Sequence, residues 1–423
     1  MFFFCISYQE MIEKWVRIGY NTIMERSESG KSWYLFRTDH IGVLDGIRAV
    51  AILVVLWFHF WQQTWLMPYY PTPFLSAFGI DSIDLNPLRR CGYLCVDWMI
   101  LLSGFVLFLP YARHRFEGTP LPSAGTFYRK RLARIVPSYL FAVLVMFFLS
   151  LSEGGYAGRT DFLWRDLITH LTFTFLFRAD TYLFSGINGV FWTVAIEVMF
   201  YAIFPLLAFA FRKRPLWTYL VMVAAGFAFT FAFCLRQSDL AFYVNRFLTF
   251  FPVFANGMLG AYLYVAFVNK APWKPLFAWI GTAVAVASAV GIWLLFEACT
   301  HTKSIQTFQL TYRYPLSLLY LGVTIGMCVS ARPIRTLLSN RVLGAIAAVS
   351  YNLYLWHQYI VVRLRIALGC KSGADVAALG AQTQWMLTVE ALVIALGWAT
   401  LITYLLERPL HRLLAGRTLR IHS

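Results

Sequence analysis

The stretch LDGIRAVAILVVLWFHF, residues 44–60, carries an arginine and a histidine inside an otherwise apolar run. Residues 43–63 are long enough to cross a bilayer, because a spanning helix needs about 20 mainly apolar residues. An ionisable group inside a span costs roughly 2.5 to 3.5 kcal/mol even on lenient insertion scales. Arg48 and His59 are separated by almost three helical turns, so they share one helix face about 16 Å apart. We expect that face to point away from lipid.

Nine further stretches have the length and the apolar character of membrane spans. They are residues 92–112, 135–152, 190–211, 216–235, 247–268, 275–297, 312–330, 342–364 and 385–406. The composition agrees, because 59% hydrophobic and 13% charged residues over 423 positions give more apolar surface than one soluble core could bury. The sequence therefore predicts an all-α, polytopic membrane helix bundle with about ten transmembrane helices. A shorter aromatic segment, 164–177, carries three ionisable residues and is expected to be re-entrant or interfacial.

The basic residues indicate the orientation of these spans. With the N-terminus inside, 23 of the 36 Lys and Arg residues fall on the cytosolic side and 12 on the outer side, as the positive-inside rule expects. We therefore predict cytosolic N- and C-termini, with a cytosolic segment 1–40, a membrane domain 41–412 and a cytosolic tail 413–423. The opening run MFFFCIS is too short for a signal peptide. This topology, rather than nucleic-acid binding, explains the net charge of +16.

The cysteine pattern does not indicate a metal site. The seven cysteines form neither CxxC pairs nor an alternation with histidine at the spacing of zinc ligands. Five of them fall on or near the predicted outer side, where a disulfide is permitted: Cys91, Cys95, Cys234, Cys299 and Cys370.

His59 and Arg48 each allow two interpretations. His59 is either a core histidine bonded to a carbonyl or a general base, since desolvation favours the neutral imidazole that accepts a proton from a hydroxyl. Arg48 either pairs with Asp45, three residues earlier, or contributes to an anion site. The shared helix face favours a function for both residues.

Arg131 and Arg134 lie three residues apart in FYRKRLARIVPSYL, residues 127–140, and so are neighbours on one helix face. They either anchor the helix at the cytosolic boundary or bind an anion, because guanidinium groups form bidentate hydrogen bonds with phosphate oxygens. Together with Arg48, they would form a basic cluster on the cytosolic side.

Glu197 lies about two turns inside FWTVAIEVMFYAIFPLL, residues 191–207. It is either the structural partner of an arginine or the acid that orients His59 and stabilises its imidazolium. Counting from the outer ends of their spans, Glu197 and His59 lie at similar depth, which favours contact between them.

Four other polar positions are assigned structural or interfacial roles. His357 is expected to be a structural histidine at a depth similar to that of His59, and Ser103-Gly104 to allow close helix packing. Asp97 is expected to be an ordinary interface residue, as are the arginines at 89 and 90.

Six motifs together resemble the acyltransferase-3 family of membrane acyltransferases, which includes bacterial polysaccharide O-acetyltransferases. In chain order, they are LDGIRAVAILVVLWFH (44–59), VDWMILLSGF (96–105), FYRKRLARIVPSYL (127–140), FWTVAIEVMFYAIFPLL (191–207), SYNLYLWH (350–357) and LLERPLHR (405–412). The resemblance covers most of the chain. It implies ten spans, acyl-CoA as the donor, and essential roles for Arg48, His59, Arg131 and Arg134. No esterase-like domain follows the last span, so we expect transfer by the membrane unit alone.

These observations lead to a functional hypothesis. We expect the phosphates of acyl-CoA, with acetyl as its acyl group, to bind Arg48, Arg131 and Arg134 from the cytosol. His59 then removes a proton from an acceptor hydroxyl of a glycan or glycolipid, with Glu197 supporting it. No permanently bound cofactor, metal or nucleic acid is expected, and the cell membrane is the expected location.

Two other classes of membrane protein could use the same residues. One is a transporter with a His/Glu proton relay, although inverted repeats are not evident in the sequence. The other is a differently folded membrane acyltransferase with a buried histidine, whose usual upstream Asn partner is not evident.

Overall fold

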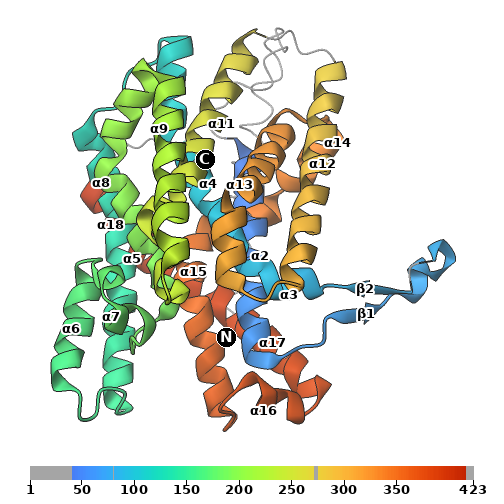
Figure 1. Ribbon diagram of the computed structural model, residues 1–423. Coiled ribbons are helices and arrows are strands. Elements are labelled where there is room, and N and C mark those ends of the chain that lie inside the picture. The colour runs from blue at the N-terminus through green and yellow to red at the C-terminus, as the bar shows by residue number, and fades with distance from the viewer. Residues whose placement is uncertain (1–40, 80, 271–274, 416–423) are drawn as a thin grey trace, which may run out of the picture. The chain divides into compact units, whose positions relative to one another are not determined.

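A computed structural model of the protein describes residues 41–79, 81–270 and 275–415 (Figure 1). The predicted cytosolic segment 1–40 and residues 416–423 of the predicted tail lie outside the described residues. From Gly42 onward, the chain forms one compact unit. Helices make up nearly all of this unit, which confirms the predicted all-α class.

The long helices of the described residues are α2 (Gly42–Thr64), α4 (Cys95–Glu117), α5 (Ala124–Ser152), α8 (Trp192–Lys213), α9 (Pro215–Phe227), α11 (Phe251–Lys270), α12 (Pro275–Thr300), α13 (Ile305–Val329), α15 (Arg341–Ala367) and α17 (Ala381–Ile402). Shorter helices are α3 (Asn86–Cys91), α6 (Thr160–Leu171), α7 (Ala179–Leu183), α10 (Leu240–Tyr243), α14 (Arg332–Leu338), α16 (Gly373–Ala378) and α18 (Arg408–Ala415). A small antiparallel hairpin, β1 (Tyr69–Pro71) with β2 (Ser82–Asp84), pairs Tyr69 with Asp84 and projects from the helices (Figure 1).

Eight helical segments within the described residues are long and apolar enough to cross a membrane, or nine if one bent pair counts as a single span. The bent pair, Ile305–Val329 with Arg332–Ala367, contains the eighth and ninth predicted stretches and turns by 119°. Pro333 begins the second segment, where its missing backbone N–H costs no helical hydrogen bond. The polytopic architecture is confirmed: eight of the ten predicted stretches correspond to these segments, and the other two lie in the bent pair.

Close packing between α4 and α11 depends on glycine. A Cβ atom on Gly104 would lie 2.5 Å from the carbonyl oxygen of Phe254, and one on Gly257 would lie 2.1 Å from that of Leu101. Any side chain at these positions would force the two helices apart. The predicted packing role of Gly104 is therefore confirmed.

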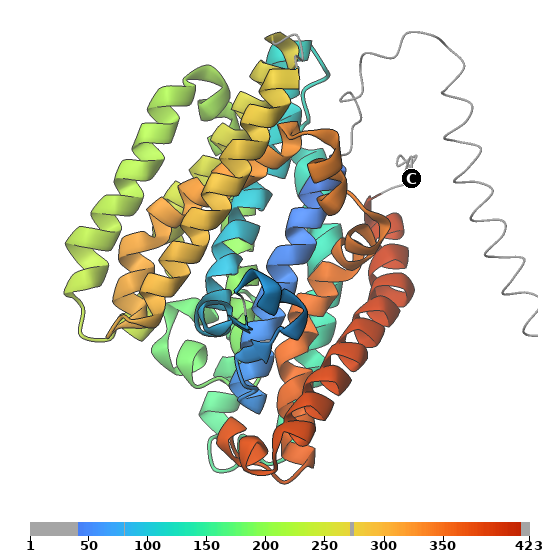
Figure 2. The same cartoon turned by 90° about the vertical axis from the view of Figure 1, so that its right-hand side faces the viewer.

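Helix α2 lies inside the bundle and packs against both α4 and α15 (Figure 2). Its fully buried positions include Ile47, Ile52 and Val55, which recur at helical spacing. Arg48 and His59 on this helix are half-buried.

The segment expected to be re-entrant or interfacial forms α6 and a following turn, and it is not among the membrane-crossing segments. Asp166 in α6 is fully buried. Its Oδ2 accepts hydrogen bonds from Tyr156 Oη at 2.7 Å, Ser185 Oγ at 3.0 Å and the Gly186 backbone N–H at 3.1 Å. The carboxylate therefore ties α6 to the loops on both sides, a structural use of a buried charge.

Asp97 is not an interface residue, contrary to the sequence-based expectation. Its side chain is 1% exposed, and Oδ2 lies 3.2 Å from Nε of Arg313, which is 3% exposed. The two residues come from α4 and α13, more than 200 positions apart, so no local pattern reveals the pair. The six cysteines within the described residues are all free and buried.

Candidate functional site

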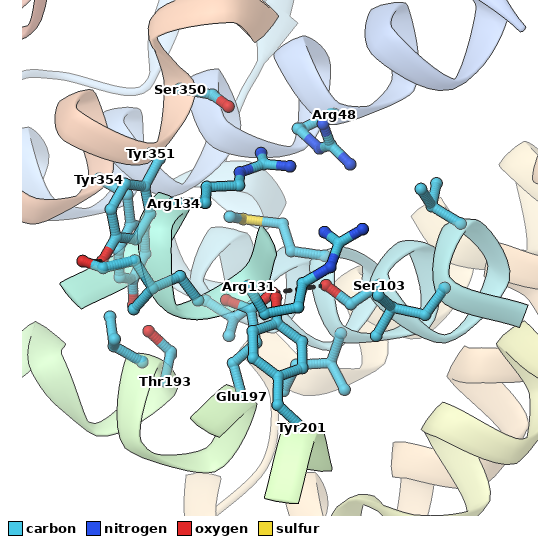
Figure 3. A pocket seen from close by; sticks show the side chains of 17 residues that line it. Arg48, Ser103, Arg131, Arg134, Thr193, Glu197, Tyr201, Ser350, Tyr351 and Tyr354 are labelled. Atoms are coloured by element: carbon cyan, nitrogen blue, oxygen red, sulfur yellow. Dashed lines mark hydrogen bonds between the residues drawn. The ribbon is translucent and has the colours of Figure 1, made fainter. Parts of the chain in front are cut away.

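A cavity between α2, α4, α5, α8 and α15 holds most of the predicted site residues. We call it the arginine cavity, because Arg48, Arg131 and Arg134 all line it. Its free volume is about 90 Å³. Figure 3 shows the three guanidinium groups converging on a common space, with Glu197 and Ser103 beside Arg131. The predicted basic cluster is therefore present in the tertiary structure.

Each arginine reaches the cavity because of its place on a helix. Arg131 and Arg134 are one turn apart on α5, which directs both side chains to the same side. Arg48 comes from the first half of α2. Arg131 also lies over the ring of Tyr201, with 6.0 Å between the guanidinium carbon and the ring centroid.

Glu197 brings a negative charge to this cluster. Its Oε1 accepts hydrogen bonds from Tyr201 Oη at 2.5 Å and from Ser103 Oγ at 2.8 Å. The carboxylate also acts electrostatically on Arg48 and Arg131. Glu197 is the one acidic side chain among the residues that line the cavity, while Asp45 also acts electrostatically on Arg48, and Glu407 and Arg134 act on each other. The lining itself offers more guanidinium groups than carboxylates, which suits an anionic ligand.

A second cavity opens around His59, and we call it the histidine cavity. Its free volume is about 380 Å³. The lining is aromatic and amide-rich: Phe58, His59, Trp61, Gln62, Arg90, Tyr93, Val96, Trp192, Asn245, Ile305, Gln309 and Tyr354. Aromatic faces with neighbouring amides suit a polyhydroxylated ligand, because they combine apolar surface with hydrogen-bonding groups.

The ring of His59 contacts an amide group of the same helix. Nδ1 lies 3.1 Å from Oε1 of Gln62, one helical turn further along α2. An amide oxygen accepts, so the tautomer that matches this contact has its proton on Nδ1 and a lone pair on Nε2. This tautomer has the basic nitrogen that a general base requires.

His357 lies next to His59 but is held differently. Its ring centroid is 5.1 Å from that of His59, and the residue is fully buried. Nδ1 bonds to the carbonyl oxygens of Tyr354 at 2.7 Å and Leu353 at 3.2 Å, within its own helix. These bonds fit the expected structural role of His357.

Two residues line both cavities: Val96 from α4 and Tyr354 from α15. The arginine cavity and the histidine cavity are therefore neighbours along the axis of α2. Arg48 opens into one and His59 into the other, about 16 Å apart for an ideal helix.

The structure thus brings four of the predicted site residues together in one cavity and places the fifth in the adjoining cavity. Arg48, Arg131, Arg134 and Glu197 line the arginine cavity, whereas His59 lines the histidine cavity. The hydrogen bonds of Glu197 among the described residues go to Ser103 and Tyr201 rather than to His59. Of the two interpretations of Glu197, the geometry favours that of a partner to the arginines.

The sequence-based reasoning missed several polar side chains of the two cavities. Tyr201 follows Glu197 by four residues, and Gln62 follows His59 by three, so helical spacing could have indicated both. Ser103 was assigned to packing alone, yet its hydroxyl binds Glu197. The contributions of α15, Ser350 and Tyr351, depend on how that helix packs, which local spacing does not reveal.

The two cavities define the chemistry that is available. The arginine cavity can bind phosphate oxygens through guanidinium forks. The histidine cavity holds an imidazole that can accept a proton. Among residues 41–79, 81–270 and 275–415, no three His, Cys, Asp or Glu side chains are placed to share a metal ion.

Comparison with known proteins identifies relatives over most of the chain. A family model described as an acyltransferase domain matches residues 41–408, which include every residue that lines the two cavities. Nodulation protein 10 of Rhizobium leguminosarum bv. viciae is 26% identical over 352 residues, or 78% of this chain and 85% of that protein. Acyltransferase MdmB of Streptomyces mycarofaciens is 28% identical over 188 residues, or 43% of this chain and 44% of that protein.

A candidate O-acetyltransferase of Staphylococcus aureus (strain COL) is 23% identical over 339 residues, or 76% of this chain and 51% of that protein. The chain thus spans about half the length of the Streptomyces and Staphylococcus relatives. No solved structure matches the chain significantly. With the family model matching most of its length and the helices of a multi-pass membrane protein, this chain belongs to the acyltransferase-3 family.

Proposed function

We propose that this protein is a membrane O-acyltransferase that transfers an acyl group from acyl-CoA to a hydroxyl group of a glycan or glycolipid. One observation carries the proposal. An anion-binding arginine cavity and a cavity with a basic imidazole adjoin each other inside the bundle, and one helix supplies Arg48 to the first and His59 to the second.

The donor occupies the arginine cavity in this proposal. Phosphate groups of acyl-CoA bind Arg48, Arg131 and Arg134, and the extended pantetheine arm runs toward His59. The separation of about 16 Å along α2 gives that arm a path. We further propose that the arginine end faces the cytosol, with both termini on that side, because Lys and Arg gather there in the sequence.

One imidazole is enough to carry the proton through the acyl transfer. Nε2 of His59 takes the proton of the acceptor hydroxyl while the oxygen attacks the thioester carbonyl carbon. The C–S bond then breaks, and the CoA thiolate receives the proton from the imidazolium. The products are the ester and free CoA, and His59 returns to its neutral form.

The acceptor occupies the histidine cavity. Trp61, Trp192 and Tyr93 offer aromatic faces, and Asn245 and Gln309 offer amide groups that can bond to sugar hydroxyls. The O-acetyltransferase name of the Staphylococcus relative supports acetyl as the acyl group. As a multi-pass protein of the cell membrane, the enzyme would receive donor and acceptor from opposite sides.

The proposal is tested with membrane vesicles that contain the wild type or His59→Ala, supplied with radiolabelled acetyl-CoA and a total glycolipid extract. Loss of the general base lowers the rate of transfer by about 10²- to 10⁴-fold. The matched control is His301→Ala, because His301 is exposed at the end of α12 and pairs with Glu297. Equal labelling by wild type and His59→Ala would show that His59 is not the base, and no labelling by the wild type would reject the proposed activity.

A further inference from the structure

The two cavities share two lining side chains. Val96 and Tyr354 line both cavities, and each is only 4% exposed. Val96 comes from the first turn of α4 and Tyr354 from the middle of α15. The two cavities therefore adjoin each other at these two residues.

One face of α4 leads from Val96 into the arginine cavity. The α4 residues that line that cavity are Val96, Met99, Ile100, Ser103, Val106 and Leu107. Their spacing of three and four residues places them on one face of the helix. From Val96 to Leu107, the face extends about 16 Å. This face is mostly apolar, as a wall beside an extended pantetheine arm would be.

The position of the Tyr354 ring is determined by its hydrogen bond. Its hydroxyl donates to the carbonyl oxygen of Val190 at 3.1 Å, which ties α15 to the turn before α8. The ring also contacts the imidazole of His357, with 5.5 Å between centroids. The aperture is thus bounded on one side by an anchored aromatic ring and on the other by a short, β-branched side chain that has a single preferred rotamer in a helix.

We propose that Val96 and Tyr354 form the aperture through which the acyl thioester reaches His59, and that this aperture selects acyl groups by their cross-section. The inference rests on the proposed function and deepens it. The acyl end of the thioester enters the aperture first, and the acyl group must then fit through the aperture lengthwise. A slender acyl group such as acetyl passes, whereas a branched or aromatic acyl group is hindered.

Bromoacetyl-CoA tests the aperture without an acceptor. Its reactive CH₂Br group alkylates Nε2 of His59 when the acyl end reaches the histidine cavity, and bromide and a proton leave. The rate of alkylation is measured by mass spectrometry of the peptide that contains His59. We expect Val96→Phe to reduce this rate, measured at saturating bromoacetyl-CoA, by about tenfold or more.

Widening the aperture should have the opposite effect. Val96→Ala should raise transfer from benzoyl-CoA relative to acetyl-CoA by about tenfold, because the removed methyl groups enlarge the opening. Val323→Ala is the matched control, since Val323 is buried on α13 and lines neither cavity. It should leave the ratio of benzoyl to acetyl transfer at the wild-type value.

A small reagent distinguishes a blocked aperture from a disturbed histidine cavity as the cause of slower alkylation. Iodoacetamide does not need the arginine cavity, so its rate with His59 reports any change that Val96→Phe causes within the histidine cavity, and the loss with bromoacetyl-CoA should exceed the loss with iodoacetamide by about tenfold or more. The inference is overturned if Val96→Phe and wild type react equally with bromoacetyl-CoA, or if Val96→Phe loses as much of its reaction with iodoacetamide as with bromoacetyl-CoA. Absence of transfer by the wild type, with intact alkylation by bromoacetyl-CoA, would reject the proposed function and leave the aperture supported.

Discussion

Two groups of buried charge lie inside the helix bundle, and they differ in how the charges are balanced. Arg313 and Asp97 form a closed pair: Arg313 Nη1 also donates to the Val244 carbonyl at 2.9 Å and to Thr249 Oγ1 at 2.6 Å. In the arginine cavity, by contrast, three guanidinium groups and the Glu197 carboxylate line an open space, and Asp45 and Glu407 act electrostatically on Arg48 and Arg134.

This difference separates structural from functional charges. A buried ion is tolerated when partners within the protein replace its water, as they do around Arg313. The arginines at 48, 131 and 134 line a cavity together with Glu197, so a ligand in that cavity can reach their guanidinium groups. Both groups look alike in the sequence, as ionisable residues within apolar stretches.

The largest effect is expected from breaking the closed pair. Asp97→Ala leaves the Arg313 guanidinium buried without its carboxylate, which should lower the free energy of unfolding by about 3–5 kcal/mol. Denaturant unfolding in detergent micelles measures the loss. The double variant Asp97→Leu with Arg313→Met should recover most of the stability, because no unpaired charge remains. A stable Asp97→Ala protein with impaired CoA binding would contradict the structural role of this pair.

The next largest effect is expected from removing one of the three guanidinium groups of the arginine cavity. Arg131→Gln removes a charge-assisted hydrogen bond to phosphate, worth about 1.5–3 kcal/mol, so CoA should bind roughly 10- to 100-fold more weakly. Titration calorimetry measures the affinity. Arg159→Gln is the control, because Arg159 is exposed and lines neither cavity. Unchanged CoA affinity in Arg131→Gln would exclude this arginine from the donor site.

Glu197→Gln distinguishes the two roles considered for Glu197. The amide retains an oxygen that can accept from Ser103 and Tyr201, but the negative charge among the arginines is lost. If Glu197 balances the arginines, CoA should bind equally or more tightly, and stability should fall by about 1 kcal/mol because charge repulsion rises. If Glu197 supports His59 instead, the turnover rate should fall with CoA affinity unchanged. Calorimetry together with single-turnover kinetics separates the two outcomes.

The smallest effect concerns an exposed charge in α7. Arg178 donates to both carboxylate oxygens of Asp180, at 3.0 and 3.1 Å, and these bonds lower the pKa of Asp180. The pair should therefore stabilise the fold above the unfolded pKa of about 3.9, and this contribution should be lost as the pH falls through the lowered folded pKa. Asp180→Asn should cost no more than about 1 kcal/mol near neutral pH.

Unfolding measured at several pH values tests this prediction. The difference in stability between the wild type and Asp180→Asn should shrink as the medium becomes acidic, because the carboxylate of the wild type is then protonated. A difference that stays constant down to low pH would show that the ion pair does not contribute.

The sequence predicted most of the secondary structure and part of the site. The Arg48 to His59 spacing correctly predicted that both residues face the interior, because residues almost three turns apart share a side of any α-helix. Arg131 and Arg134 follow the same rule. The prediction for Glu197 relied on depth counted from the ends of two spans. Depth gives a position along a helix but not its rotation, and the geometry places Glu197 with the arginines.

The span count shows a related limit. The sequence indicated separate stretches at 312–330 and 342–364, and both do lie in helices. Whether two helices joined by a sharp bend cross the bilayer separately is decided by their packing. The same holds for the Asp97–Arg313 pair, whose partners are brought together by α4 and α13.

By itself, the sequence determined that this protein is a helical membrane protein with ionisable residues facing its interior, because hydrophobicity and the helical repeat are properties of local sequence. Only the tertiary structure decided which charges are paired, that Glu197 lies among the arginines, and that Val96 and Tyr354 line both cavities. These features depend on contacts between helices far apart in the chain, and such contacts are set by how side chains of different helices pack against one another.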